Sequence, residues 1–213
     1  MGKGIFITFE GGEGCGKSSH IAALAAYFES LGRTCVLTRE PGGTKLGEKI
    51  RELLLHAKEG EAMSPKTEIL LFSAARAQHV EEFIKPALAE GKVVICDRFY
   101  DSSTAYQGAA RSLGADIVKN LNAFAAEGAR PDLTVLLDLP AEVGLARARA
   151  RDTNGADRMG SEKISFYEAV RSSFLKIAES EPERFAVVNS SGSKEETFAK
   201  ILEAVRGRLH VGR

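Results

Sequence analysis

The chain has 213 residues, of which 44% are hydrophobic and 27% are charged, a composition that is ordinary for a globular protein with one buried core. Its 29 basic and 29 acidic residues cancel, so no overall positive field favours nucleic acid or a membrane surface, and no run approaches the ~20 apolar residues of a membrane helix. Because Cys15, Cys35 and Cys96 form no C-x-x-C pair, we expect neither a disulfide framework nor a zinc site, and we predict a cytoplasmic protein.

Short apolar runs alternate with helical patterns along the chain. The predicted strands are 4–9, 33–38, 93–96, 133–137 and 185–188. The predicted helices are 17–31, 45–57, 65–90, 101–127, 141–151, 162–180 and 194–209. Nearly continuous apolar strands separated by helices indicate an α/β fold, in which helices cover both faces of a five-stranded parallel sheet. Because no repeat or linker interrupts the pattern, we predict a single domain over residues 1–213.

The first loop carries the most specific motif. Residues 11–18 match G-x-x-x-x-G-K-[ST] between a predicted strand and a predicted helix, which indicates a P-loop NTPase fold rather than a plain glycine-rich turn. Its glycines let backbone N–H groups converge on an anion, and the following helix adds its positive end. Lys17 can reach the β- and γ-phosphates of a nucleoside triphosphate, and the Ser18 hydroxyl can bind Mg²⁺. The predicted triphosphate-binding residues are Gly11, Gly12, Glu13, Gly14, Cys15, Gly16, Lys17 and Ser18, and the family resemblance described below implies that their ligand is ATP.

This motif alone does not separate ATPases, GTPases and kinases. GTPases typically read guanine with an N-K-x-D or T-K-x-D segment, and neither occurs in this sequence. The absence of that segment argues against a GTPase. The remaining question is which second ligand the site accepts.

A second cluster begins at the carboxyl end of the predicted strand 93–96, where open α/β sheets place ligands. Asp97 can hold Mg²⁺ through water, and Arg98 offers a guanidinium fork that can bridge acceptor and donor phosphates. Ser103 and Gln107 are four residues apart, so on a helix they share one face. The alternative is a strand-end acid paired with a surface arginine.

Two further segments extend the predicted acceptor site. Phe72 and Arg76 are four residues apart on the helix 65–90, so a ring that can stack on a base lies beside a guanidinium that can bind its edge. Phe72 taken alone fits a core position, because it follows two leucines. Residues 39–44 form a rigid glycine-bearing loop after the second strand, and Arg51, taken singly, is a solvated charge.

Four arginines lie in or near the predicted helix 141–151: Arg147, Arg149, Arg151 and Arg158. The turn-forming residues 152–157 separate the first three from the last. Arg147 and Arg151 share one helical face, with Arg149 about 200° away. A solvated basic face is the plain alternative. Beside a P-loop, however, an arginine-bearing lid can close over a triphosphate, exclude water and stabilise charge. We predict such a lid over residues 147–160.

Together these segments resemble thymidylate kinases, and most closely those of bacteria. The matching segments are 9–18, 39–44, 97–99, 105–108 and 147–158. The resemblance covers essentially the whole chain. It implies transfer of the γ-phosphate of ATP to dTMP with Mg²⁺, in dTTP biosynthesis, by a homodimer.

The resemblance also implies roles for the residues of the acceptor site. Phe72 would stack on thymine, and Arg76 would contact the edge of the base. Ser103 and Gln107 match further base contacts, and Tyr106 matches a ring that crowds the sugar and disfavours a ribose 2′-hydroxyl.

The phosphate-binding roles follow in the same way. Arg51 and Arg98 match the residues that grip the acceptor phosphate, and Glu40 and Pro41 are assigned to the same substrate site. One branch of the family carries its catalytic arginine in the P-loop, where this chain has Glu13, so the chain resembles the branch with a basic lid. Phe99 stands where tyrosine or histidine is frequent, which puts any polar role there in doubt. The predicted catalytic residues are Lys17, Arg98, Arg149 and Arg151.

Two alternatives stay open at this point. A kinase for another nucleoside monophosphate or for a deoxynucleoside would keep the same P-loop. A P-loop protein that binds ATP without transferring phosphate would not need Arg98, Phe72 and Arg76 in this arrangement.

Overall fold

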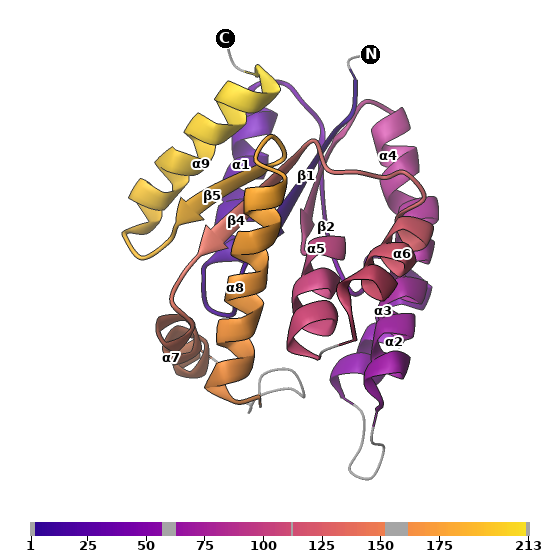
Figure 1. The fold of residues 1–213 in the computed structure, drawn as a ribbon. Helices are drawn as coiled ribbons and strands as arrows, with labels where there is room; N and C mark the ends of the chain where they lie inside the picture. Colours follow the sequence, from indigo (N-terminus) through magenta and orange to yellow (C-terminus); the bar gives the residue numbers. More distant parts are fainter. Residues whose placement is uncertain (1–2, 57–62, 112, 152–161, 212–213) are drawn as a thin grey trace.

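A computed structural model of the chain describes residues 3–56, 63–111, 113–151 and 162–211. Its core is one parallel sheet with the strand order β2-β3-β1-β4-β5 (Figure 1). The strands are β1 (Ile5–Glu10), β2 (Cys35–Arg39), β3 (Val93–Asp97), β4 (Leu133–Asp138) and β5 (Phe185–Asn189). The five predicted strands are therefore confirmed, with ends that shift by one or two residues.

Helices connect the strands. They are α1 (Lys17–Ser30), α2 (Lys45–Leu55), α3 (Pro65–His79), η1 (Val80–Ile84), α4 (Lys85–Ala89), α5 (Tyr100–Ser103), η2 (Thr104–Ala110), α6 (Ala115–Ala126), α7 (Ala141–Arg151), α8 (Ile164–Ser180) and α9 (Lys194–Leu209). The segments η1 and η2 are π-helical. Within the described ranges, no helix is both long and apolar enough to cross a membrane.

The predicted helix 101–127 is wrong as a single element. It divides into α5 with η2 and a separate α6, because Gly114 adopts a φ of 93°, which a right-handed helix cannot contain. The predicted helix 65–90 does run on, as α3, η1 and α4 follow one another without a break.

Side chains of β1 alternate between two buried clusters, as a sheet covered on both faces requires. Ile7 and Phe9 pack in a cluster with α1 and α9, whereas Phe6 packs with η1, α4 and Phe99. A third cluster joins β4 to η2 and α8 through Leu136. Figure 1 shows the sheet between these layers, with α1 and α9 on one side and α3, α4 and α6 on the other.

The position of β1 creates the crevice in which ligands of such sheets bind. From β1 the chain goes to β2 and β3 on one side, then crosses to β4 and β5 on the other. Phe9 aligns with Asp97 across β1 and β3, and the N–H of Arg98 donates to the carbonyl oxygen of Phe9 at 2.9 Å. The loops that follow β1 and β3 therefore leave the sheet side by side, at a topological switch point.

A buried ion pair joins the segment after β3 to the start of β5. The side chain of Arg184 is 2% exposed and donates to both carboxylate oxygens of Asp101, at 2.6 and 2.9 Å. It also donates to Glu181 at 2.8 Å and to the hydroxyl of Thr134 at 2.8 Å. Several charge-assisted hydrogen bonds therefore satisfy a cation that would otherwise be costly to bury.

We expect Arg184→Met to lower the free energy of unfolding by about 3–5 kcal/mol, because it leaves the buried carboxylate of Asp101 without its cation. Urea denaturation measures the change. Arg130→Met is the matched control, since Arg130 pairs with the same Glu181 but is 66% exposed, and its loss should cost less than about 1 kcal/mol. Equal costs for the two variants would contradict this assignment.

Candidate active site

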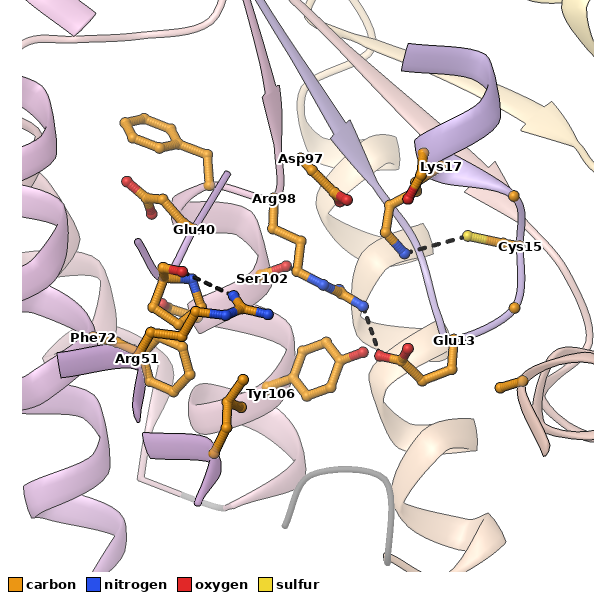
Figure 2. A pocket seen from close by; sticks show the side chains of 18 of the residues that line it. Glu13, Cys15, Lys17, Glu40, Arg51, Phe72, Asp97, Arg98, Ser102 and Tyr106 are labelled. Carbon is orange, nitrogen blue, oxygen red and sulfur yellow. Dashed lines mark hydrogen bonds and ion pairs between the residues drawn. The ribbon is translucent and has the colours of Figure 1, made fainter. Parts of the chain in front are cut away.

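A cavity of about 940 Å³ opens at the carboxyl ends of the strands, a size suited to nucleotide-like ligands. Its walls come from the loop after β1, from α2 and α3, from the segment after β3, and from α7. Figure 2 shows Arg98 between Phe72 and Arg51 on one side and Lys17 and Cys15 on the other. The structure thus brings the P-loop and the residues of the predicted acceptor site into one cavity.

The P-loop forms one end of this cavity. Residues 13–18 line it, whereas Gly11 and Gly12, which follow β1, are not among the lining residues. The ammonium of Lys17 donates to the carbonyl oxygens of Gly11 and Gly12 at 3.2 and 2.9 Å. Helix α1 begins without a side-chain cap, so the N–H groups of its first turn can bind an anion.

Helix α7 rests directly on the P-loop. Gly14 has a φ of 66°, and a Cβ placed on it would lie 2.1 Å from the carbonyl oxygen of Gly144. A Cβ on Gly144 would lie 2.3 Å from the carbonyl oxygen of Glu13. Only glycines permit this approach. The sequence reasoning missed Gly144, although a glycine within a helical pattern is a known signal of close packing.

Arg98 joins the P-loop to the segment after β3. Its guanidinium donates to Glu13 at 2.7 Å, to the carbonyl oxygen of Gly11 at 3.0 Å and to the Ser102 hydroxyl at 3.3 Å. It also lies over the ring of Tyr106, 5.2 Å from the centroid. Its partner is therefore Glu13 and not the neighbouring Asp97. The side chain is 18% exposed, so it can reach a ligand in the cavity.

A buried carboxyl group supports the turn that presents Arg98. Arg98 has a φ of 67°, a strained conformation for a residue with a side chain. Glu10 accepts hydrogen bonds from the N–H of Phe99 at 2.8 Å and from the hydroxyl of Ser102 at 2.6 Å. Burial, and then the charge of Asp101, raise the pKa of Glu10 to about 8, against the lowering effect of Ser102. The sequence reasoning gave Glu10 no role, although an acid that ends an apolar strand was a visible signal.

The wall of the cavity on the Phe72 side is built around Arg76, whose side chain is 1% exposed yet lines the cavity. It donates to Glu40 at 2.8 Å, to Asn122 at 2.7 Å and to the Ser103 hydroxyl at 3.0 Å. Its guanidinium lies 5.4 Å from the ring centroid of Phe99. The apolar residue at position 99 thus supports Arg76, in the place where a polar role was in doubt.

Glu40 and Pro41 both line the cavity, as predicted for substrate-site residues. Glu40 is itself buried, and its second oxygen lies 3.1 Å from Nδ1 of His79. Both oxygens of Glu40 thus face protein donors, so its first task is to hold Arg76. The carbonyl oxygen of Pro41 accepts from Arg51 at 2.8 Å, which turns Arg51 into the cavity and away from bulk solvent.

Phe72 is both part of a hydrophobic cluster and a lining residue of the cavity. It is half-buried against a cluster of α2 and α3 residues, and one side of the ring faces the cavity. Ser103, Tyr106 and Gln107 line the same space. They belong to α5 and η2, so a π-helical turn still places Ser103 and Gln107 at one wall.

Two oxygen donors of the cavity fit Mg²⁺. Oδ1 of Asp97 is buried and has no hydrogen-bond partner among the described residues, and the hydroxyl of Ser18 is at the start of α1. The described part of the chain holds no group of three or more His, Cys, Asp or Glu side chains suited to a metal. A site with few protein ligands suits Mg²⁺, which keeps waters and binds phosphate oxygens.

The arginines of the predicted lid are described only in part. Arg147 and Arg149 both line the cavity. Arg147 also donates to the carbonyl oxygens of Ser190 and Ser191 at 3.2 and 3.4 Å. The side chain of Arg151 and residues 152–161, which include Arg158 and most of the predicted lid 147–160, lie outside the described residues. Lys194, at the start of α9, also lines the cavity, and no sequence pattern pointed to it.

A phosphate cradle and an aromatic–arginine wall thus share one cavity at the switch point of a parallel sheet. This fold and this site define a P-loop nucleotide kinase.

Comparisons with known proteins narrow this class. The family model for thymidylate kinase matches residues 9–201. A thymidylate kinase of Geotalea uraniireducens (strain Rf4) is 50% identical over 214 residues, covering 98% of this chain and 100% of the relative. One of Geobacter sulfurreducens is 50% identical over 210 residues, covering 97% and 98%. The crystal structure of thymidylate kinase from Ehrlichia chaffeensis aligns with a TM-score of 0.78 and 31% identity over 95% of this chain and 99% of that one. The chain belongs to the thymidylate kinase family.

We expect Gly144→Ala to lower kcat/KM by about 10²-fold, because the added methyl group pushes α7 away from the P-loop and a shift of about 1 Å is enough for such a loss. Steady-state kinetics measure it. Gly207→Ala in α9 is the matched control, since nothing lies within 4 Å of the added Cβ. It should keep full activity and gain about 0.5–1 kcal/mol of stability. Normal turnover by Gly144→Ala would show that α7 is not held by this contact.

Proposed function

We propose that the chain transfers the γ-phosphate of ATP to dTMP, giving ADP and dTDP for dTTP biosynthesis. The observation that carries this proposal is the position of Arg98, which lies between the P-loop and the Phe72 side of one cavity. Membership of the thymidylate kinase family supports the choice of both substrates.

ATP would bind with its triphosphate in the P-loop. Residues 13–18 line one end of the cavity, where backbone N–H groups and the ammonium of Lys17 would hold the β- and γ-phosphates. Ser18 and Asp97 would hold Mg²⁺ directly or through water. When bound, the metal ion neutralises charge on the phosphate oxygens.

dTMP would bind at the opposite wall. Its base would stack on Phe72, with Arg76, Ser103 and Gln107 at the edge of the ring and Tyr106 beside the sugar. Its phosphate would bind Arg51 and Arg98, next to the loop that contains Glu40 and Pro41. The same two arginines face the cavity in the structure, and guanidinium forks suit phosphate oxygens.

The reaction requires little acid–base catalysis, because the acceptor phosphate is already anionic near neutral pH. One oxygen of the dTMP phosphate attacks the γ-phosphorus of ATP. The bond between the γ-phosphorus and the oxygen that bridges it to the β-phosphate breaks, and ADP leaves with that oxygen. Two polyanions must be brought together and aligned. Four positive side chains would offset this repulsion and stabilise the transferred group. They are Lys17, Arg98, Arg149 and Arg151, the last two in the proposed lid formed by residues 147–160.

We expect Lys17→Ala and Arg98→Ala each to lower kcat/KM by about 10²-fold or more while the fold is kept, because each removes a positive charge that faces the transferred phosphate. ADP release is measured with dTMP, with other nucleoside monophosphates and with thymidine. Lys200→Ala, at an exposed position of α9, is the control and should be neutral. Strong turnover of another acceptor in preference to dTMP, or normal turnover by both variants, would refute the proposal.

We also propose a cytoplasmic homodimer. Cys15, Cys35 and Cys96 are free thiols, which suits a reducing compartment. Four large apolar side chains are more than half exposed on α2, α3 and α6, which lie together in Figure 1. They are Leu53, Leu70, Ile117 and Phe124, the last 83% exposed. Large exposed apolar side chains on neighbouring helices are typical of subunit contacts.

Phe124→Asp should convert this dimer into a monomer, because it places a charge in an apolar contact. Light scattering after size-exclusion chromatography measures the mass. Leu31→Asp, which adds the same charge at an exposed position after α1, should stay dimeric. A monomeric unmodified chain would end this part of the proposal.

A further inference from the structure

The amide of Gln107, at the base-binding wall, is held from behind by a buried acid. Nε2 of Gln107 donates to Oε1 of Glu68 at 2.8 Å. Both residues are 1% exposed. Gln107 lines the cavity and Glu68 does not, so Glu68 can act on a ligand only through its neighbour.

The chemistry of this contact fixes which way the amide points. An ionised carboxylate accepts hydrogen bonds and cannot donate them. The NH₂ group of Gln107 must therefore face Glu68, and the carbonyl oxygen Oε1 is left for the cavity. The reversed amide would set an oxygen against a carboxylate and lose a charge-assisted hydrogen bond.

Glu68 is itself held as an acceptor. Nε of Arg111 lies 3.4 Å from the same carboxylate oxygen, and Arg111 is fixed by an ion pair with Glu162 at 2.6 Å and by the ring of Phe166, 4.9 Å from its guanidinium. Glu68 is also in the first turn of α3, where the positive helix end favours a negative charge. Two side-chain donors and a helix N-terminus are thus directed at the Glu68 side chain.

We infer that Glu68 is a positioning residue that sets base selectivity, by locking Gln107 with its carbonyl oxygen toward the base. This inference rests on the proposed function, which stacks the base on Phe72 with Arg76 and Gln107 at the edge of the ring. Arg76 offers N–H donors and Gln107 offers an acceptor. Thymine has the complementary edge, with a carbonyl oxygen beside an N3–H group. Cytosine has an amino group and an unprotonated N3. Its amino donor would face the N–H donors of Arg76, and its N3 acceptor would face the carbonyl oxygen of Gln107.

The test replaces the Glu68 carboxyl group, which accepts the hydrogen bond from Gln107, with an apolar side chain of similar volume. The variants are Glu68→Met, Glu68→Gln, Gln107→Leu and the double variant Glu68→Met/Gln107→Leu, with Glu203→Met, exposed on α9, as the control. For each, kcat and KM are measured with dTMP and with dCMP. We expect Glu68→Met to lower the dTMP-to-dCMP ratio of kcat/KM by about ten-fold or more, chiefly through KM, because the freed amide can turn to suit either base.

The other variants separate selectivity from simple structural damage. Glu68→Gln should keep most of the selectivity, because its amide oxygen can still accept from Gln107 and Arg111. The double variant should be no less selective than Gln107→Leu alone, because Glu68 acts only through Gln107. Glu203→Met should match the unmodified chain.

The outcomes are distinct. If Glu68→Met keeps the full ratio, or lowers kcat/KM equally for both nucleotides, the inference is wrong although dTMP kinase activity stands. If the unmodified chain does not turn over dTMP, the proposed function itself fails. Should Glu68→Met not fold, Glu68→Ala, in which water can enter behind Gln107, carries the same comparison and the same two results.

Discussion

The meeting of Arg98 with the P-loop is the constraint on which the site depends. Parallel pairing of β1 and β3 sets the N–H of Arg98 on the carbonyl oxygen of Phe9, so the side chain necessarily emerges beside residues 11–13. The strained backbone of Arg98 is held by the buried carboxyl of Glu10. Sheet register, and not the local sequence, thus places the Arg98 guanidinium between the P-loop and the Phe72 side of the cavity.

The surrounding elements hold the residues on both sides of Arg98 in place. On the P-loop side, α7 packs by a glycine-to-glycine contact and carries Arg149 to the cavity. On the Phe72 side, Arg76 and Gln107 are each held by a buried acidic side chain, from Glu40 and Glu68 respectively. Groups fixed in advance by such partners do not need to be ordered again when a ligand binds, and this preorganisation favours both selectivity and rate.

Much of this organisation could be predicted from the sequence. The P-loop, the Asp97–Arg98 turn and the pairing of Phe72 with Arg76 depend on short spacings, and the structure brings all of them to one cavity. The supporting contacts could not be predicted. Glu40 and Arg76 are 36 residues apart, and Glu10 and Ser102 are 92 apart, so only the folded chain pairs them. The break at Gly114 was missed because helical periodicity continues on both sides of it.

The most direct test is a crystal structure with dTMP and a non-hydrolysable ATP analogue bound together. The account predicts that the dTMP phosphate contacts Arg98 and that one of its oxygens lies about 3–3.5 Å from the γ-phosphorus, opposite the bridging oxygen. Thymidine bound far from Phe72, or a phosphate beyond in-line reach of the P-loop, would contradict it.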